Sequence, residues 1–189
     1  MERALIVSSS NNKIPDILEL LYHASFAEIV TLENCGEARR LLLDQSYDLC
    51  IIHTPLPDEF GEELALDIVS DSITQVVLIV KNELYHIIAE KAEISGIFTV
   101  SKPVDKETFW SVLRMANAVY NRLQRLKSEN NRLVQNLEDM RLITRAKCLI
   151  IEKTKMSEAE AHKYLEKQAM DRRMTKRAVA EQVLKTFEF

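Results

Sequence analysis

The chain has 189 residues, 47% of them hydrophobic and 29% charged, with a formal net charge of −4 at pH 7. No apolar run approaches the roughly 20 residues of a membrane span, and the N-terminus lacks the basic and apolar regions of a signal peptide. The three cysteines, Cys35, Cys50 and Cys148, are widely spaced, so we interpret them as reduced core residues. Their spacing does not match that of a zinc site. We therefore expect a cytoplasmic protein that is not membrane-bound and carries no metal or other cofactor.

The charge is divided unevenly along the chain. Residues 1–115 hold 9 Lys and Arg against 19 Asp and Glu, a net charge of −10, whereas residues 116–189 hold 16 against 10, a net charge of +6. An acidic front and a basic back are expected when only the back of a protein meets a polyanion. Nucleic acid is the first candidate for that partner.

Short apolar runs rich in β-branched residues alternate with helical patterns over the front of the chain. The predicted strands are Ala4–Val7, Glu28–Thr31, Leu49–Ile52, Val76–Val80 and Ile97–Val100, and the predicted helices lie near Lys13–Ser25, Gly36–Gln45, Gly61–Ser70 and Leu84–Ile94. Five such units predict an α/β fold with a doubly wound parallel sheet. In such folds, sites form at the carboxyl ends of the strands.

Two stretches near predicted strand ends carry a family resemblance. The run Asp48–His53, followed by the proline-containing turn Thr54–Gly61, and the later Ser101-Lys102-Pro103 resemble the receiver domain of bacterial two-component response regulators over roughly residues 1–115. The resemblance implies a five-stranded, flavodoxin-like fold. It also implies a phosphoryl-transfer site built from carboxylates, a hydroxyl group and a lysine.

Most residues of that site are absent. Ser8 and Ser9 replace the acid pair that would hold Mg²⁺, His53 stands at the phosphoacceptor position, and Val80 stands at the hydroxyl position. Lys102 remains, but one lysine without a metal or a nucleophile cannot assemble phosphoryl transfer. We therefore expect a pseudo-receiver that is not phosphorylated and no enzymatic activity.

Other polar residues near this site leave alternatives open. His53 could be phosphorylated, bind a metal or switch near neutral pH, but a lone histidine at a strand end is more often a hydrogen-bonded structural residue. Asp58 and Glu59 could fold back towards Lys102 or lie in a solvated turn.

A domain without switch chemistry can still bind a regulatory protein. The resemblance to receivers implies an interaction surface formed by the fourth helix, fifth strand and fifth helix. The aromatic residues there can equally belong to the core; they are Tyr85, His86, Phe98, Phe109 and Trp110.

One uninterrupted helix is predicted from about Asp105 to Lys155, a stretch with no glycine or proline. Its apolar or small residues recur at alternating steps of three and four, which is the pattern of a coiled coil. The a positions are Ala116, Leu123, Asn130, Leu137 and Thr144, and the d positions are Val119, Leu126, Leu133 and Met140. Leucine at d with a single Asn at a favours a parallel dimer. The alternative is a long helix packed on its own domain.

A small helical module is predicted after this seam. Ser157 to Glu160 form a capping box that starts a second helix, and Thr175 can cap a third. Residues Arg141–Leu184 resemble an ANTAR domain, the RNA-binding output module of antitermination regulators. The stretches that carry this resemblance are Arg145–Ile150, Met156–Ala161, Tyr164-Leu165, Gln168–Arg173 and Val179–Val183.

Cations gather at two places in this module, which suits phosphate and unpaired bases. Arg141, Arg145 and Lys147 lie late in the long helix, and Arg172, Arg173, Lys176 and Arg177 lie around the turn into the last helix. The plain alternative is a pair of solvated helix faces.

The resulting prediction has three parts: a receiver-like domain over 1–115, a coiled-coil helix over 116–140 and an ANTAR-like module over 141–189. Together with the ANTAR resemblance, this layout of domains is similar to that of the amidase-operon antiterminators. It implies a homodimeric regulator that binds structured leader RNA and is controlled by a partner protein. The alternatives are a DNA-binding response regulator and a coiled-coil interaction scaffold.

Overall fold

The structure, a computed structural model, describes residues 1–9, 14–24 and 26–187 and divides them into two compact units, Met1–Arg125 and Leu126–Phe189. No helix within these residues is long and apolar enough to cross a membrane.

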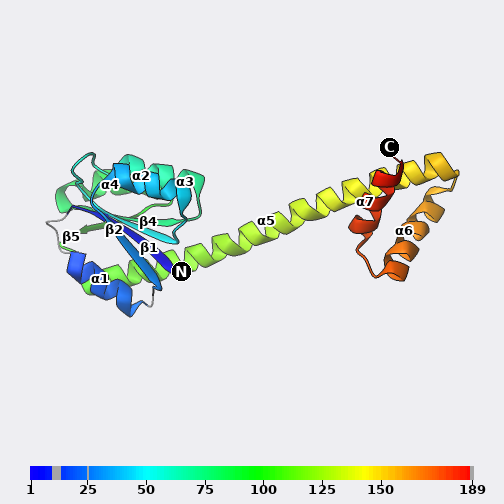
Figure 1. Ribbon diagram of the computed structural model, residues 1–189. Helices are drawn as coiled ribbons and strands as arrows, with labels where there is room; N and C mark the ends of the chain where they lie inside the picture. Colours follow the sequence, from blue (N-terminus) through cyan, green and yellow to red (C-terminus); the bar gives the residue numbers. More distant parts are fainter. Residues whose placement is uncertain (10–13, 25, 188–189) are drawn as a thin grey trace. The chain divides into compact units, whose positions relative to one another are not determined.

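The first unit is a five-stranded parallel sheet with helices on both faces (Figure 1). The strands are β1 (Arg3–Ser8), β2 (Glu28–Leu32), β3 (Leu49–His53), β4 (Gln75–Lys81) and β5 (Phe98–Lys102), in the order β2-β1-β3-β4-β5. The helices between them are α1 (Ile14–His23), α2 (Cys35–Asp44), α3 (Glu62–Asp71) and α4 (Asn82–Ile94). This confirms the predicted α/β fold, although the predicted ends of the first helix, Lys13 and Ser25, lie outside the described residues.

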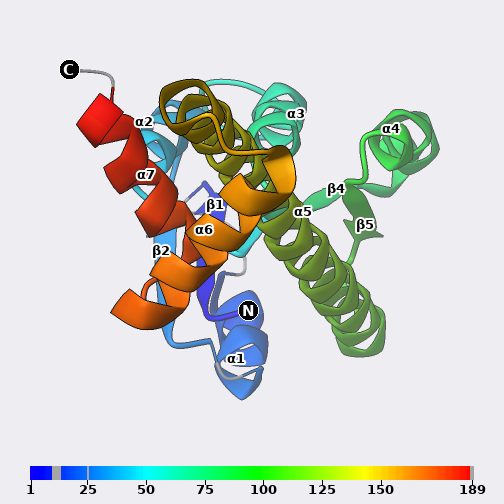
Figure 2. The ribbon, with the colours of Figure 1, turned by 90° about the vertical axis from the view of Figure 1, so that its right-hand side faces the viewer.

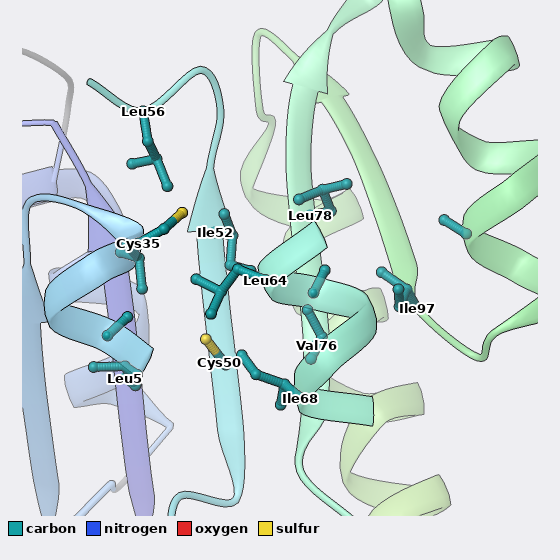
Figure 3. Close-up of a cluster of buried hydrophobic side chains, with 14 of the residues drawn as sticks. Leu5, Cys35, Cys50, Ile52, Leu56, Leu64, Ile68, Val76, Leu78 and Ile97 are labelled. Atoms are coloured by element: carbon teal, nitrogen blue, oxygen red, sulfur yellow. The ribbon is translucent and has the colours of Figure 1, made fainter. Parts of the chain in front are cut away.

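The strands alternate their side chains between two hydrophobic clusters, because successive residues of a strand point to opposite faces. In β3, Cys50 and Ile52 join the cluster under α2, α3 and α4, whereas Leu49 and Ile51 join the cluster under α1 and α5. Figure 3 shows the first cluster, where side chains of α3 lie over those of β3 and β4. Burial on both faces explains why β1, β3 and β4 are almost continuously apolar.

Helix α5 (Lys106–Thr154) confirms the predicted long helix. Its first turns pack on the sheet, where Phe109 is fully buried and Ala116 has no exposed surface. Tyr120 lies farther along and donates a short hydrogen bond to Asp48, whose carboxylate also accepts from the backbone N–H groups of Glu2 and Arg3. The packing of α5 on the first domain thus continues beyond residue 115, the predicted boundary of that domain.

The structure also tests the predicted burial of the aromatic residues and of the cysteines. Phe109 belongs to the core, and Phe98, Trp110 and Tyr85 are partly buried against it, so these rings do not form an open aromatic surface. The predicted core cysteines are buried at positions 35 and 50, where desolvation raises both thiol pKa values, but Cys148 is exposed. The expectation of three core cysteines was therefore wrong for Cys148.

The second unit packs α6 (Glu158–Arg172) and α7 (Lys176–Phe187) against the end of α5 (Figure 2). Its core is rich in alanine, which lets the three helices approach closely; the buried set is Ala146, Ile150, Ala161, Leu165, Ala169, Val179, Ala180, Val183 and Leu184. The predicted capping box is present, with Ser157 and Glu160 each accepting from the other's backbone N–H. The side chain of Thr175 accepts from the N–H of Ala178 at 3.2 Å, as a cap of α7 should.

We expect Gly61→Ala to destabilise the first domain by about 2 to 4 kcal/mol. Gly61 has a φ of +100°, and a Cβ there would lie 2.8 Å from Cγ2 of Ile52, so backbone strain and overpacking add. Gly96→Ala is the matched control, because Gly96 has a φ of +76° but no atom near the added Cβ. It should cost only about 1 kcal/mol. Equal losses of stability in chemical denaturation would contradict the role of crowding at Gly61.

Candidate functional site

The predicted receiver-type residues meet at the carboxyl edge of the sheet. Ser8 and His53 end neighbouring strands and lie directly opposite each other in the β1–β3 register. Val80 is fully buried near the end of β4, and Lys102 ends β5. Lys102 donates through Nζ to the backbone oxygen of Thr54, in a short hydrogen bond. The structure therefore brings together the ends of four strands, as the sequence predicted.

His53 is buried and sits between a hydroxyl group and a cation. Its Nδ1 lies 3.2 Å from Oγ of Ser8. Desolvation and, to a lesser extent, the charge of Lys102 lower the pKa of His53 to about 4. The imidazole is therefore neutral at physiological pH. Such a ring can donate one hydrogen bond and accept another.

Among the described residues, the ends of β1, β3, β4 and β5 at this edge carry no carboxylate side chain. Among the described residues, no three His, Cys, Asp or Glu side chains are grouped as metal ligands would be. The hydroxyl groups of Ser8 and Thr54 remain near the edge, but Thr54 Oγ1 donates to the backbone oxygen of Ile79 at 3.1 Å. The site thus has polar atoms without the negative charge that binds Mg²⁺.

In the acidic turn after β3, Asp58 is exposed, in keeping with the solvated alternative, and it also caps a helix. Asp58 accepts hydrogen bonds from the backbone N–H groups of Cys35 and Gly36 at 3.1 and 2.9 Å, at the N-terminus of α2. These bonds lower the carboxyl pKa of Asp58 against the opposing effect of desolvation, and a helix N-terminus favours negative charge. Glu59 pairs with Arg39 at 2.8 Å. Neither acid reaches towards Lys102.

The predicted dimer seam runs along the middle of α5. Leu126, Leu133, Leu137 and Met140 are each at least half exposed, Asn130 is exposed and Leu123 is half-buried. Val134, which neighbours the seam on the helix surface, is also about half exposed at 49%. Within the described chain, this apolar stripe is therefore largely uncovered.

The cations of the second unit lie at two levels of α5. Arg177 lies in the first turn of α7 and reaches back to Asp139 at 2.6 Å, while its Nε donates to Glu181 at 2.9 Å. Lys147 pairs instead with Glu158 at 3.0 Å. Glu158 is the first residue of α6, whereas Arg177 follows the other end of that helix. Arg177 and Lys147 therefore bind acidic residues at different places along α5 and α6, which the sequence did not predict.

The seven cations also differ in how strongly local partners hold them. Lys176 pairs with Glu166 at 2.6 Å, and Arg172 donates to Gln182 at 2.9 Å. Arg141 and Arg173 make no side-chain hydrogen bond or ion pair with the described residues, and both are exposed. Arg145, like Lys176 and Arg172, is not free of partners within the protein. Arg141 and Arg173 are thus the predicted cations most open to a ligand.

Arg173 occupies an unusual backbone position. It ends α6 with φ 53° and ψ 42°, in the left-handed region that glycine adopts most easily. The N–H of Met174 bonds the carbonyl of Ala169, and the N–H of Arg173 bonds that of Met170, which together form a Schellman cap. A charged side chain has been placed where the backbone alone would favour glycine.

Solved structures resemble the chain over its first unit. A signal receiver domain of an HD domain-containing protein from Pseudomonas fluorescens aligns with a TM-score of 0.58 at 22% identity, covering 66% of this chain and 92% of that one. A CheY-like receiver domain from Methylobacillus flagellatus aligns with a TM-score of 0.53 at 20% identity, covering 61% and 98%. The first unit has the receiver fold.

The second unit matches a family model. Residues 131–184, which include the end of α5, α6 and most of α7, match the ANTAR domain. The chain thus contains a unit with the receiver fold and a later segment that matches the ANTAR domain.

Two relatives with regulatory names are similar to this chain in sequence. The transcriptional regulatory protein PdtaR of Mycobacterium tuberculosis is 27% identical over 171 residues, covering 90% of this chain and 83% of that protein. The aliphatic amidase regulator of Pseudomonas aeruginosa is 26% identical over 111 residues, covering 59% of this chain and 57% of that protein.

Sequence reasoning missed two lysines beside the receiver-type site. Lys81 ends β4 opposite Lys102 in the β4–β5 register, and Lys106 begins α5. Both line a cavity that also contacts His53 and Lys102. Lys81 could have been predicted at this site, because it directly follows the fourth apolar run. Parallel strands bring their carboxyl ends to one edge of the sheet.

We expect the His53 ring to titrate at about 4, and Lys102→Gln to raise that pKa by removing a nearby positive charge. An unfolded histidine binds its proton near pH 6.5. Since the folded state resists protonation, stability should fall as pH drops from about 6.5 towards 4. Imidazole carbon shifts in NMR titrations of both proteins measure this. A His53 pKa at or above 6.5 in the unsubstituted protein would contradict the buried, neutral ring.

Proposed function

We propose that the chain is a homodimeric transcription antitermination regulator that binds structured leader RNA through its ANTAR domain. The observation that carries this proposal is the match of residues 131–184 to the ANTAR domain, on a module with exposed cations. The basic character of the back of the chain, with a net charge of +6 over residues 116–189, agrees with an anionic partner. The relatives named as a transcriptional regulatory protein and an amidase regulator support a role in gene control.

The proposed RNA contacts divide according to the observed partners. Arg141 and Arg173 offer guanidinium groups that no described side chain occupies, and arginine can bond phosphate bidentately and stack on unpaired bases. Arg172, Lys176 and Lys147 would exchange exposed local partners for phosphate. Arg177 is held by two carboxylates, so its first role is to fix the start of α7 against α5.

The proposed dimer rests on the uncovered seam of α5. Leucines at successive d positions bury little surface within one chain, and burial against a second copy would remove them from water. Asn130 would meet its symmetry mate, where two amides can pair. Each dimer would carry two ANTAR domains, which suits a leader RNA with two similar hairpins, as the resemblance to antiterminators implies.

The proposed mechanism is a shift between two RNA structures. Binding would favour an RNA fold that is incompatible with the terminator hairpin, so that polymerase reads through. The regulator catalyses no reaction in this mechanism, and it acts in the cytoplasm, where the leader RNA is made.

We also infer that the receiver-type domain works without aspartyl phosphorylation and responds to a protein partner. His53 and Ser8 stand where carboxylates would be needed, which supports the first part. Exposed apolar residues of α4, including Ile87 and Ile94, are available for the second. They replace the aromatic residues as the basis for a partner surface.

Two rival functions can be separated from RNA binding. A DNA-binding regulator would need a recognition helix with polar base-reading side chains, but Val179, Ala180, Val183 and Leu184 of α7 are buried in the module. A coiled-coil scaffold would bind neither nucleic acid. A mobility-shift comparison of hairpin RNA with duplex DNA distinguishes the three.

We expect Arg173→Gly to weaken RNA binding while stabilising the ANTAR domain by about 0.5 to 1 kcal/mol, because glycine suits the left-handed backbone and removes the guanidinium group. The slope of log affinity against log salt should fall by roughly 0.7 to 0.9 for each phosphate group that the variant no longer neutralises. Equilibrium binding to hairpin RNA over a salt series measures both the affinity and this slope.

Lys155→Gly is the matched control for this variant. Lys155 also has a left-handed backbone, with a φ of 59°, and its substitution removes one positive charge from the same module. It should stabilise the module similarly and leave the RNA affinity unchanged. Equal RNA binding by Arg173→Gly and the unsubstituted protein would move the RNA-binding surface away from this turn.

We expect sedimentation equilibrium to give a dimer for the unsubstituted chain and Asn130→Leu to raise its melting temperature while allowing higher oligomers. An apolar residue at this a position would add burial and remove the amide pair that specifies two strands. Asn131→Leu, just off the seam, serves as a control with no expected change in oligomeric state. A monomer at micromolar concentration would refute the dimer.

A further inference from the structure

A cavity of about 750 Å³ opens at the carboxyl edge of β3, β4 and β5, beside the starts of α4 and α5. This volume lies within the range of about 300 to 1,000 Å³ that is usual for small-molecule sites. It belongs entirely to the first compact unit. The cavity therefore needs no second chain and no part of the ANTAR domain for its walls.

Among the described residues, three lysines line this cavity. Lys81 and Lys102 lie opposite each other in the β4–β5 register, and Lys106 approaches from the first turn of α5. Glu83 is the one carboxylate among the described lining residues, so the lining carries a net positive charge. This concentration of cations is unexpected in a segment with a net charge of −10 over residues 1–115.

These lysines have few anionic partners of their own. Among the described residues, Lys81 has no ion pair, and Lys106 has only a distant one, 4.0 Å from Glu19. Lys102 donates to a backbone oxygen instead of a carboxylate. Its pKa is lowered by desolvation and then by the charge of Lys81, as expected when like charges converge without an anion between them.

Uncharged donors complete the polar side of the cavity. His53 is more than nine-tenths buried and lines the cavity, and its Nδ1 faces Ser8, so the opposite nitrogen, Nε2, is left for a ligand. Helix α4 begins at Asn82 with no side-chain cap. The unpaired N–H groups of a helix start are a common cradle for phosphate.

Apolar side chains form another part of the cavity wall. Ile17 and Leu20 of α1 are both nearly buried and contact it, together with Val104. A fully hydrated inorganic ion would leave this wall unused. The chemistry fits an organic anion with a compact charged head and a short apolar body.

We propose that this cavity binds a small phosphate monoester, with the phosphate held by Lys81, Lys102, Lys106 and the start of α4, and the organic part against Ile17 and Leu20. A phosphate monoester is close to doubly charged above pH 7, which matches the excess positive charge better than a single carboxylate does. This site is separate from the proposed RNA contacts and does not depend on them.

The test titrates the full-length protein with butyl phosphate at pH 7.5 and measures the dissociation constant by calorimetry. Shifts of the His53 ring and of the Asn82 amide in NMR spectra locate the bound ligand. Lys81→Gln and Lys106→Gln should each weaken binding roughly tenfold, the usual loss for a charge-assisted hydrogen bond. Lys91→Gln, an exposed position of α4 outside the cavity, should leave the affinity unchanged.

Two further ligands separate the parts of the proposal. Valerate, with a single charge and a similar body, should bind more weakly than butyl phosphate, and 1-butanol should not bind measurably. Equal binding of either one would overturn the phosphate assignment. Absence of butyl phosphate binding at millimolar concentration, or unchanged affinity in both lysine variants, would overturn the site itself.

Discussion

Helix α5 supplies side chains to the hydrophobic cores of both compact units, and most features of the chain follow from this shared use. Near its start, Phe109 and Leu113 are buried under the sheet, and near its end Ala146 and Ile150 are buried under α6 and α7. Between them, the helix has no core of its own to join. A sequence without glycine or proline keeps the backbone helical through this stretch.

The middle of α5 leaves an apolar stripe largely uncovered within the described residues. An isolated helix is only marginally stable in water, and most helical stability in proteins comes from tertiary packing. Here the packed ends hold the helix, so the middle is free to carry the a and d residues of a coiled coil. The small module benefits in turn, because α6 and α7 are short and can bury only a modest core without the last turns of α5.

Much of the fold could be predicted from the sequence because local signals agree with tertiary packing. The strands β1, β3 and β4 are apolar and buried on both faces, and all five strand ranges were found within about two residues. The caps at Ser157 and Thr175 rest on contacts within four residues. The candidate sites depend on contacts between residues far apart in the chain. That Asp58 caps α2, and that Arg177 pairs with Asp139, could not be read from local patterns.

The same distinction applies to individual cations. A cluster of basic residues in a sequence gives the sum of their charges but not how much of each charge is already compensated. In the ANTAR domain, Arg177 faces two carboxylates, whereas Arg173 faces none of the described residues despite a backbone that would prefer glycine. Residues kept in disfavoured backbone conformations often have functional reasons, which makes Arg173 the more informative of the two.

At the receiver-type sheet edge, a few residue differences change the sign of the net charge. Carboxylates at strand ends would attract a divalent cation, and that cation would then draw in a phosphoryl group. With serines and a neutral histidine in their place, the positive charge of Lys102 is no longer balanced, and Lys81 and Lys106 add to it. Burial strengthens this field, because charges in a partly desolvated cavity are screened less than charges on the surface. A sheet edge without metal ligands therefore has electrostatics that favour an anion directly.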